Sequence, residues 1–95
     1  MKSVVVTGSF TIENVSDIQE QMRSALARYN GKHRIEVDLS EVTEFDGAGM
    51  QLLLAFRKAA DKAGAEIDMG DLPDIIATTL RRFDVISRFT TQEAV

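Results

Sequence analysis

The stretch that decides the fold reads VDLSEVTEFDGAGMQLLL and occupies residues 37–54. Its second half is almost entirely apolar, and Asp46 stands directly before it, where a side-chain oxygen can cap the first turn of a helix. We expect this helix to run to about Ala63 and to stop at Gly64, because glycine commonly follows the last turn. A strand that leads into a buried helix is the unit from which α/β domains are built.

The strand before this helix alternates strictly over residues 34–39. Ile35, Val37 and Leu39 face one side and the charged residues face the other, as in a strand with one buried face. Residues 66–69 repeat the alternation. Parallel strands that are covered on both faces are continuously apolar instead. We therefore expect helices to cover mainly one face of the sheet.

The N-terminal third of the chain predicts two strands and a helix. The β-branched run of residues 4–7 favours a strand, Gly8 breaks it, and residues 10–12 favour a second, short strand. Ser16 and Gln19 are spaced as a capping box, which predicts a helix start. The apolar side chains of this helix recur on one face: Ile18, Met22, Ala25, Leu26 and Tyr29.

The C-terminal third predicts a third helix after a turn at residues 70–73, with Pro73 in the first turn. Its expected inward stripe consists of Ile75, Ile76, Thr79, Leu80 and Phe83. From Val85 onward the sequence does not decide between a short strand and a helix. The order of elements predicts one α/β domain over residues 1–95, with a mixed sheet of about four strands.

Composition excludes several classes of function. A chain of 95 residues forms one domain. Its net charge of −4 and pI of about 4.9 repel phosphate backbones and anionic lipid, so we expect no nucleic-acid partner, and Arg81 and Arg82 fit a solvated helix end. The absence of cysteine excludes disulfides and thiolate metal sites. The apolar run of residues 4–6 is too short for a signal peptide or a membrane span, so we expect a cytoplasmic chain without membrane insertion.

No constellation of residues predicts catalysis. His33 lies in a turn, and no second His or Cys exists to form a metal site with it. The carboxylates that lie near one another sit on predicted polar faces and are interpreted as solubilising charge: Glu36, Asp38, Asp61, Glu66 and Asp68. The glycine-rich helix start at residues 46–49 lacks the Lys-Ser/Thr of a phosphate loop, although its amides favour an anion. We expect no enzyme activity, no cofactor and no metal.

Residues 37–54 resemble the signature of the STAS family, the domain of sulfate transporters and anti-sigma-factor antagonists. In that family a strand ending in an Asp-Leu-Ser-type stretch is followed by a loop, an Asp-Ser-x-Gly or Asp-Thr-x-Gly motif and a Leu-rich helix. Asp46 and Gly49 match the Asp and the Gly of that motif. The similarity extends over most of the chain and includes residues 6–8, 64–69 and 80–86.

The resemblance implies a bacterial regulatory module that binds a GHKL-type anti-sigma kinase in partner switching. In such relatives the kinase phosphorylates the Ser or Thr after the Asp, and the phosphate breaks the complex, as expected for a dianion at an interface. Here that position is Gly47, which has no hydroxyl. Three interpretations follow: a permanently unphosphorylated binder, a circuit without phosphorylation, or the use of another nearby hydroxyl, with Thr43 and Ser40 as candidates.

The resemblance also leaves a second class of partner open. Some small STAS proteins are subunits of ABC-type lipid-transport complexes docked on the ATPase, and others are chemotaxis-associated, with a segment similar to residues 50–57 here. We expect the partner to contact a loop at residues 43–45 and the first turn of the helix after it. The predicted partner-binding residues are Thr43, Glu44, Phe45, Asp46, Gly47, Ala48 and Met50. Phe45 is either an exposed apolar anchor or a core residue.

Overall fold

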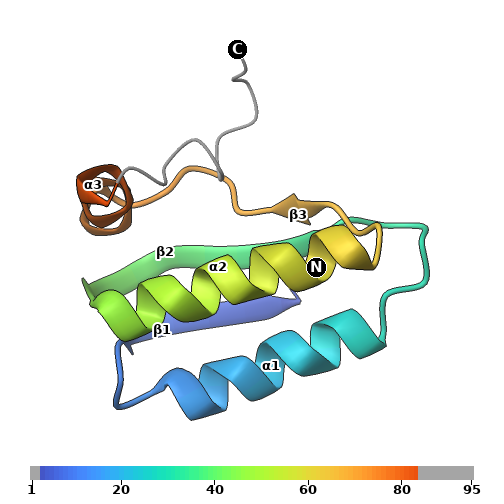
Figure 1. Ribbon diagram of the computed structural model, residues 1–95, viewed down its shortest axis with the longest axis horizontal. Helices are drawn as coiled ribbons and strands as arrows, with labels where there is room; N and C mark the ends of the chain where they lie inside the picture. The colour runs from blue at the N-terminus through green and yellow to red at the C-terminus, as the bar shows by residue number, and fades with distance from the viewer. Residues whose placement is uncertain (1–2, 84–95) are drawn as a thin grey trace.

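The computed structural model describes residues 3–83, which form three strands and three helices. In chain order these are β1 (Val4–Phe10), α1 (Val15–Ala27), β2 (Ile35–Phe45), α2 (Gly47–Lys62), β3 (Ile67–Asp68) and α3 (Asp74–Arg82). The strands form a parallel sheet in the order β1-β2-β3 (Figure 1). The undecided segment from Val85 onward lies outside the described residues.

The predicted α/β class and the one-sided cover of the sheet are confirmed. Along β2, the side chains of Ile35, Val37 and Leu39 are buried, whereas Glu36 and Asp38 between them are only half-buried. α1 packs against both β1 and α2, and α2 runs along the same side of the sheet (Figure 1). The alternation of β2 therefore reflects a helix-covered face and a polar face.

The strand count is lower than predicted, because the expected second strand at residues 10–12 does not form. Gly8 does not end β1 but lies within it, with a φ of +74° that glycine adopts without strain. Phe10 is the last residue of β1, and the chain turns at Thr11. The described strands also pair only in parallel, so the sheet formed by residues 3–83 is not mixed.

The pairing of β1 with β2 shifts register at two points, and these shifts change which residues in the C-terminal half of β2 face the core. The register runs through the pairs Val5–Asp38, Thr7–Glu41, Gly8–Val42 and Ser9–Glu44. β2 carries one extra residue at each of the two breaks, as in a β-bulge. The spacing of its inward residues accordingly lengthens from two to three after Leu39, and the next are Val42 and the half-buried Phe45.

α1 confirms its predicted buried face but not its predicted start. Ile18, Met22 and Ala25 are buried, and Leu26 and Tyr29 pack against the same core. The helix begins at Val15, with Asn14 rather than Ser16 at the N-cap, so the predicted capping box is wrong. The side-chain amide of Asn14 instead donates a hydrogen bond from Nδ2 to the carbonyl oxygen of Ser9 at 2.8 Å, which fixes the turn to the end of β1.

α3 buries a narrower stripe than predicted. Ile76 and Leu80 are fully buried and α3 contacts β2, but Ile75 and Phe83 are exposed. Pro73 is the N-cap of this helix, with extended backbone, and does not lie within its first turn. No helix within residues 3–83 has both the length and the apolar character needed to cross a membrane.

Candidate functional site

Asp46 joins two segments that are far apart in the sequence. Its backbone is extended, and its Oδ1 accepts a hydrogen bond from the Gly49 amide at 2.9 Å, which confirms the predicted cap of α2. Its Oδ2 accepts a second hydrogen bond, from the amide of Ile12, at 3.1 Å. One carboxylate therefore fixes the start of α2 against the turn that follows β1.

These hydrogen bonds also set the charge of Asp46. The backbone hydrogen bond from Gly49, followed by that from Ile12, lowers the pKa of the Asp46 carboxyl below its ordinary value, because both amides stabilise the ionised form. The positive end of the α2 dipole acts in the same direction. Asp46 is thus an ionised structural acceptor at neutral pH.

Gly49 shows why the motif ends in glycine. A Cβ built on Gly49 would lie 2.2 Å from the carbonyl oxygen of Phe10, a separation that no real side chain adopts. The helix start consequently approaches the end of β1 more closely than any other residue would permit. The Asp-x-x-Gly spacing therefore serves packing: Asp46 binds the turn after β1, and Gly49 allows the start of α2 to approach the end of β1.

Gly47 is in the opposite situation. It is exposed as the first residue of α2, and a Cβ built on it meets no atom within 4 Å. Its backbone is not in the left-handed region that favours glycine. A side chain with a hydroxyl would fit here, so the fold does not require the glycine at the position where the resemblance places a phosphate acceptor.

The residues predicted to form a loop before Asp46 lie at the end of β2 instead, because β2 stays paired with β1 up to the pair Phe10–Phe45. Thr43 and Glu44 are exposed there, and the Ser9 hydroxyl donates a hydrogen bond to Glu44 Oε1. Phe45 is half-buried and meets Phe10 edge to face, with ring centroids 5.2 Å apart. The core interpretation of Phe45 thus describes its packing better than that of an exposed anchor.

The remaining candidates flank this site. Ala48 and Met50 are half-buried in the first turn of α2, and Met50 packs against the core. Ser40 lies further back on β2, where its hydroxyl donates to Asp38 Oδ1 at 2.6 Å. Neither Ser40 nor Thr43 lies at the helix N-terminus, so neither occupies the place of the hydroxyl that Gly47 lacks.

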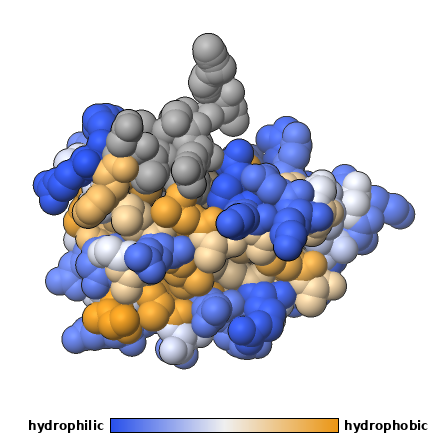
Figure 2. Space-filling model, in the orientation of Figure 1, coloured by the Kyte–Doolittle hydropathy of each residue, from blue (hydrophilic) through white to orange (hydrophobic). Residues whose placement is uncertain are grey.

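Ile12 is the residue of this surface that the sequence did not single out. Its side chain is 68% exposed, the highest value among the described large hydrophobic residues. Its amide is bound by Asp46, so it lies directly beside the start of α2. Figure 2 shows apolar surface over the turn between β1 and α1, at lower left. The sequence predicted a short strand over residues 10–12, and in a paired strand Ile12 would not be expected to stand exposed in a turn.

Charge is distributed unevenly between the two ends of the molecule. Helices α1 and α2 run antiparallel to the strands, so the N-termini of these two helices lie at the same end of the molecule as the C-termini of β1 and β2 (Figure 1). That end carries Glu13, Asp17, Glu44 and Asp46, whereas the opposite end carries charges of both signs: Arg28, Lys32, Arg34, Lys62, Asp61, Glu66 and Asp68. The exposed Ile12 is therefore set in an acidic surface.

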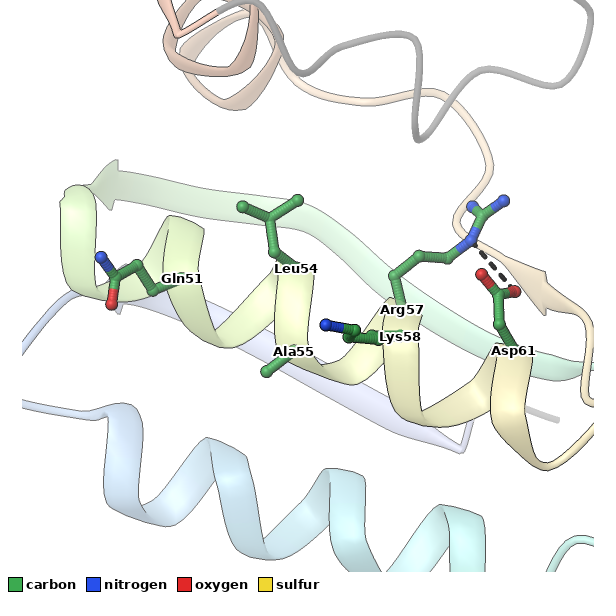
Figure 3. Close-up of a pocket in the computed structure, with 6 residues that line it drawn as sticks. All are labelled: Gln51, Leu54, Ala55, Arg57, Lys58 and Asp61. Atoms are coloured by element: carbon green, nitrogen blue, oxygen red, sulfur yellow. Dashed lines mark ion pairs between the residues drawn. The ribbon is translucent and has the colours of Figure 1, made fainter.

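A shallow hollow of about 620 Å³ lies along the outer face of α2 (Figure 3). It is lined by Gln51, Leu54, Ala55, Arg57, Lys58 and Asp61, and Arg57 Nε lies 3.5 Å from Asp61 Oδ1. All six residues belong to one helix. A catalytic pocket gathers polar groups from several elements, and this hollow does not do so.

His33 and Arg34 lie outside this surface, at the opposite end of the sheet. His33 is exposed in the segment before β2. Arg34 lies 3.4 Å from Asp68 and 3.8 Å from Glu66, across an exposed edge. Within residues 3–83, no group of three or more His, Asp or Glu side chains is placed to hold a metal ion.

Comparison with known protein families gives a match. A family model described as "Mlab, STAS domain" matches residues 2–87, which is most of the chain. The matched span includes the Asp46 clamp, the close approach at Gly49 and all three described strands.

Proposed function

Because the chain belongs to the STAS domain family, we propose that it is a non-catalytic, cytoplasmic protein-binding module whose partner contacts the surface around the first turn of α2. The family is generally linked to anti-sigma-factor antagonism or related regulatory roles and is generally non-catalytic. The proposed partner surface lies at the end of β2, the first turn of α2 and the turn after β1, and we call it the α2-start surface. It consists of Ile12, Thr43, Glu44, Phe45, Asp46, Gly47, Ala48 and Met50.

The observation that carries this proposal is the double hydrogen bond of Asp46. By holding Ile12 and Gly49 with one carboxylate, Asp46 supports a surface that is ordered before any partner arrives. A preordered surface loses less conformational entropy on binding. The exposed Ile12 side chain supplies apolar contact area at its centre, and Gly47 keeps the backbone beside it accessible.

The acidic character of this end supports a partner with basic residues around an apolar pocket. Glu13 follows Ile12 in the chain and Asp46 accepts a hydrogen bond from the Ile12 amide, so two acidic residues lie next to it. Potentials of opposite sign across an interface speed association and fix its orientation. A salt-dependent association rate is the expected kinetic signature.

Our preferred partner is a GHKL-type anti-sigma kinase in partner switching, with this chain as a permanently unphosphorylated binder. The acceptor position is Gly47, and the hydroxyls of Ser40 and Thr43 lie along β2 rather than at the helix start. A phosphate at either of those hydroxyls would lack the amides and dipole of the α2 N-terminus that favour an anion.

An ABC ATPase, or a component of a chemotaxis assembly, is the second candidate. The observation that favours it is the open space at Gly47: the fold accommodates a hydroxyl there, yet the chain has none. A subunit that is held in a stable complex needs no phosphorylation switch.

The test is a native co-purification of the tagged full chain, with the bound proteins identified by mass spectrometry. Recovery of a GHKL-type kinase supports the antagonist function, and recovery of an ABC ATPase or a chemotaxis component supports the second candidate. The parallel experiment uses Gly47→Asp, which places a charge on the proposed surface. The matched control is Asn30→Asp, which adds the same charge at the opposite end and keeps an oxygen for the Lys32 amide.

Loss of the partner from Gly47→Asp but not from Asn30→Asp supports the α2-start surface. Equal recovery with both variants would place the interface elsewhere. A further variant, Gly47→Ser, separates the two candidate functions. It restores the missing hydroxyl in an open position, so a GHKL-type kinase partner is expected to phosphorylate it, whereas an ATPase subunit is expected to remain unmodified.

A further inference from the structure

The outer edge of β1 is not guarded by charge or by proline within the strand. Within residues 3–83, the strand order places β1 at one edge of the sheet. Its sequence, VVVTGSF, contains no charged residue and no proline and begins with three β-branched residues. Edge strands are commonly guarded against pairing with another chain by lysine, by proline or by a covering segment.

Two amides from the α1 region occupy this edge instead. The Val5 amide donates a hydrogen bond to Gln21 Oε1 at 3.1 Å, and Gln21 Nε2 donates to the Val5 carbonyl oxygen, also at 3.1 Å. The Asn14 side chain satisfies the Ser9 carbonyl oxygen further along the strand, at 2.8 Å. The Gln21 side chain thus reproduces the donor and acceptor that a neighbouring strand would present to Val5.

We propose that the outer edge of β1 is a latent strand-pairing surface for a second copy of this chain, held closed by the side chain of Gln21. An identical strand is the fitting occupant, because two uncharged copies of this segment pair about a twofold axis without placing like charges opposite one another. The inference does not rest on the proposed partner binding, since β1's outer edge lies outside the α2-start surface.

Gln21 is suited to this role because the fold does not depend on it. α1 is attached to the core by Ile18, Met22 and Ala25, whereas Gln21 is exposed on the helix surface. Removal of its amide leaves the Val5 groups facing solvent, where water or another strand can satisfy them. The expected consequence is self-association without unfolding.

The experiment compares Gln21→Leu with Gln19→Leu by sedimentation velocity over a range of concentrations. Leucine has a helix propensity similar to that of glutamine, so both variants preserve α1. Gln19 is also exposed on α1, and its side chain makes no hydrogen bond within the described residues. We expect Gln21→Leu to self-associate with a dissociation constant at least about tenfold lower than that of Gln19→Leu and wild type.

A second substitution separates strand pairing from exposure of apolar surface. Thr7 is exposed on β1, and adding Thr7→Lys to Gln21→Leu places a charge on the pairing strand, which is expected to return the chain to the wild-type state. Circular dichroism verifies that each variant is folded, with Gln21→Ala as the alternative if Gln21→Leu is not. Equal association of the folded Gln21 and Gln19 variants, or association that Thr7→Lys leaves unchanged, would overturn the proposal.

Discussion

Asp46 and Gly49 have complementary roles in bringing the start of α2 against the end of β1. Asp46 supplies two acceptor oxygens, and Gly49 removes the side chain that would collide with Phe10. Gly47, two residues away, has neither function and meets open space. The two glycines of the Asp-Gly-Ala-Gly segment are consequently expected to respond oppositely to the same substitution.

Gly49→Ala is expected to destabilise the fold by about 1–3 kcal/mol or more, since its Cβ must displace the Phe10 carbonyl. Gly47→Ala is the matched control and is expected to leave stability unchanged or raise it by up to about 1 kcal/mol, because alanine restricts the unfolded chain. Urea unfolding of the two variants and wild type gives the comparison. Equal effects of the two substitutions would contradict the close approach at Gly49.

The Asp46 carboxylate also predicts a dependence of stability on pH. Hydrogen bonds from Gly49 and Ile12 lower its pKa in the folded state, so its contribution is fully present above its unfolded pKa of about 3.9. The contribution is lost as the pH falls through the lower folded-state pKa. Asn at this position keeps one acceptor oxygen but never carries the charge.

Unfolding of wild type and Asp46→Asn, measured from neutral pH down to about pH 2, tests this prediction. Wild type is expected to be the more stable protein at neutral pH, with a gap that narrows in acid below about pH 4. A gap that stays constant through the acid range would show that ionisation of Asp46 does not contribute to stability.

Among the elements, α2 was the most predictable and the β1–α1 connection the least. The Asp46 cap, the apolar first half and the stop near Gly64 follow from residues adjacent in sequence, and the helix has these bounds. The start of α1 was missed because Asn14 binds Ser9 and Ile12 binds Asp46, and these contacts depend on how β1 and α2 are placed. A local sequence pattern such as the Ser16 capping box carries no information about these long-range contacts.

β2 illustrates the same distinction within one strand. Alternation predicted residues 34–39, where the pairing with β1 is regular. The two later breaks in register depend on the partner strand, so they leave no period-two pattern, and the residues after them were expected to form a loop. After these shifts, Glu44 and Phe45 are the last two residues of β2, directly before Asp46.

The turn between β1 and α1 yields a prediction of its own, because Ile12 is exposed at its centre. Ile12→Ser is expected to change stability by less than about 0.5 kcal/mol, as for other surface positions, and to weaken partner binding by about tenfold. Ile75→Ser, which alters an exposed isoleucine on α3, is the control and is expected to leave binding unchanged. Equal affinities of the two variants in calorimetry would remove Ile12 from the interface.

At the scale of the whole molecule, the sequence predicted the domain class, the family and the position of the Asp-x-x-Gly motif better than the details of the surface. The apolar faces of helices and the alternation of strands are visible in residues close together in the sequence, and they identify the core. Ile18, Val37 and Leu53 are buried accordingly. The surface around Asp46 is assembled from β1, β2 and α2, so its inclusion of Ile12 required the three-dimensional arrangement.

The most direct test of the central claim is the affinity of Gly47→Asp for the co-purified partner, measured by isothermal calorimetry against Asn30→Asp. Both variants carry one added negative charge, and Gly47 has space for the new side chain at a helix N-terminus that favours it, so both are expected to fold. The account predicts at least about a tenfold loss of affinity, or about 1.4 kcal/mol, for Gly47→Asp alone. Unchanged affinity of a folded Gly47→Asp would contradict the assignment of the α2-start surface as the partner-binding site.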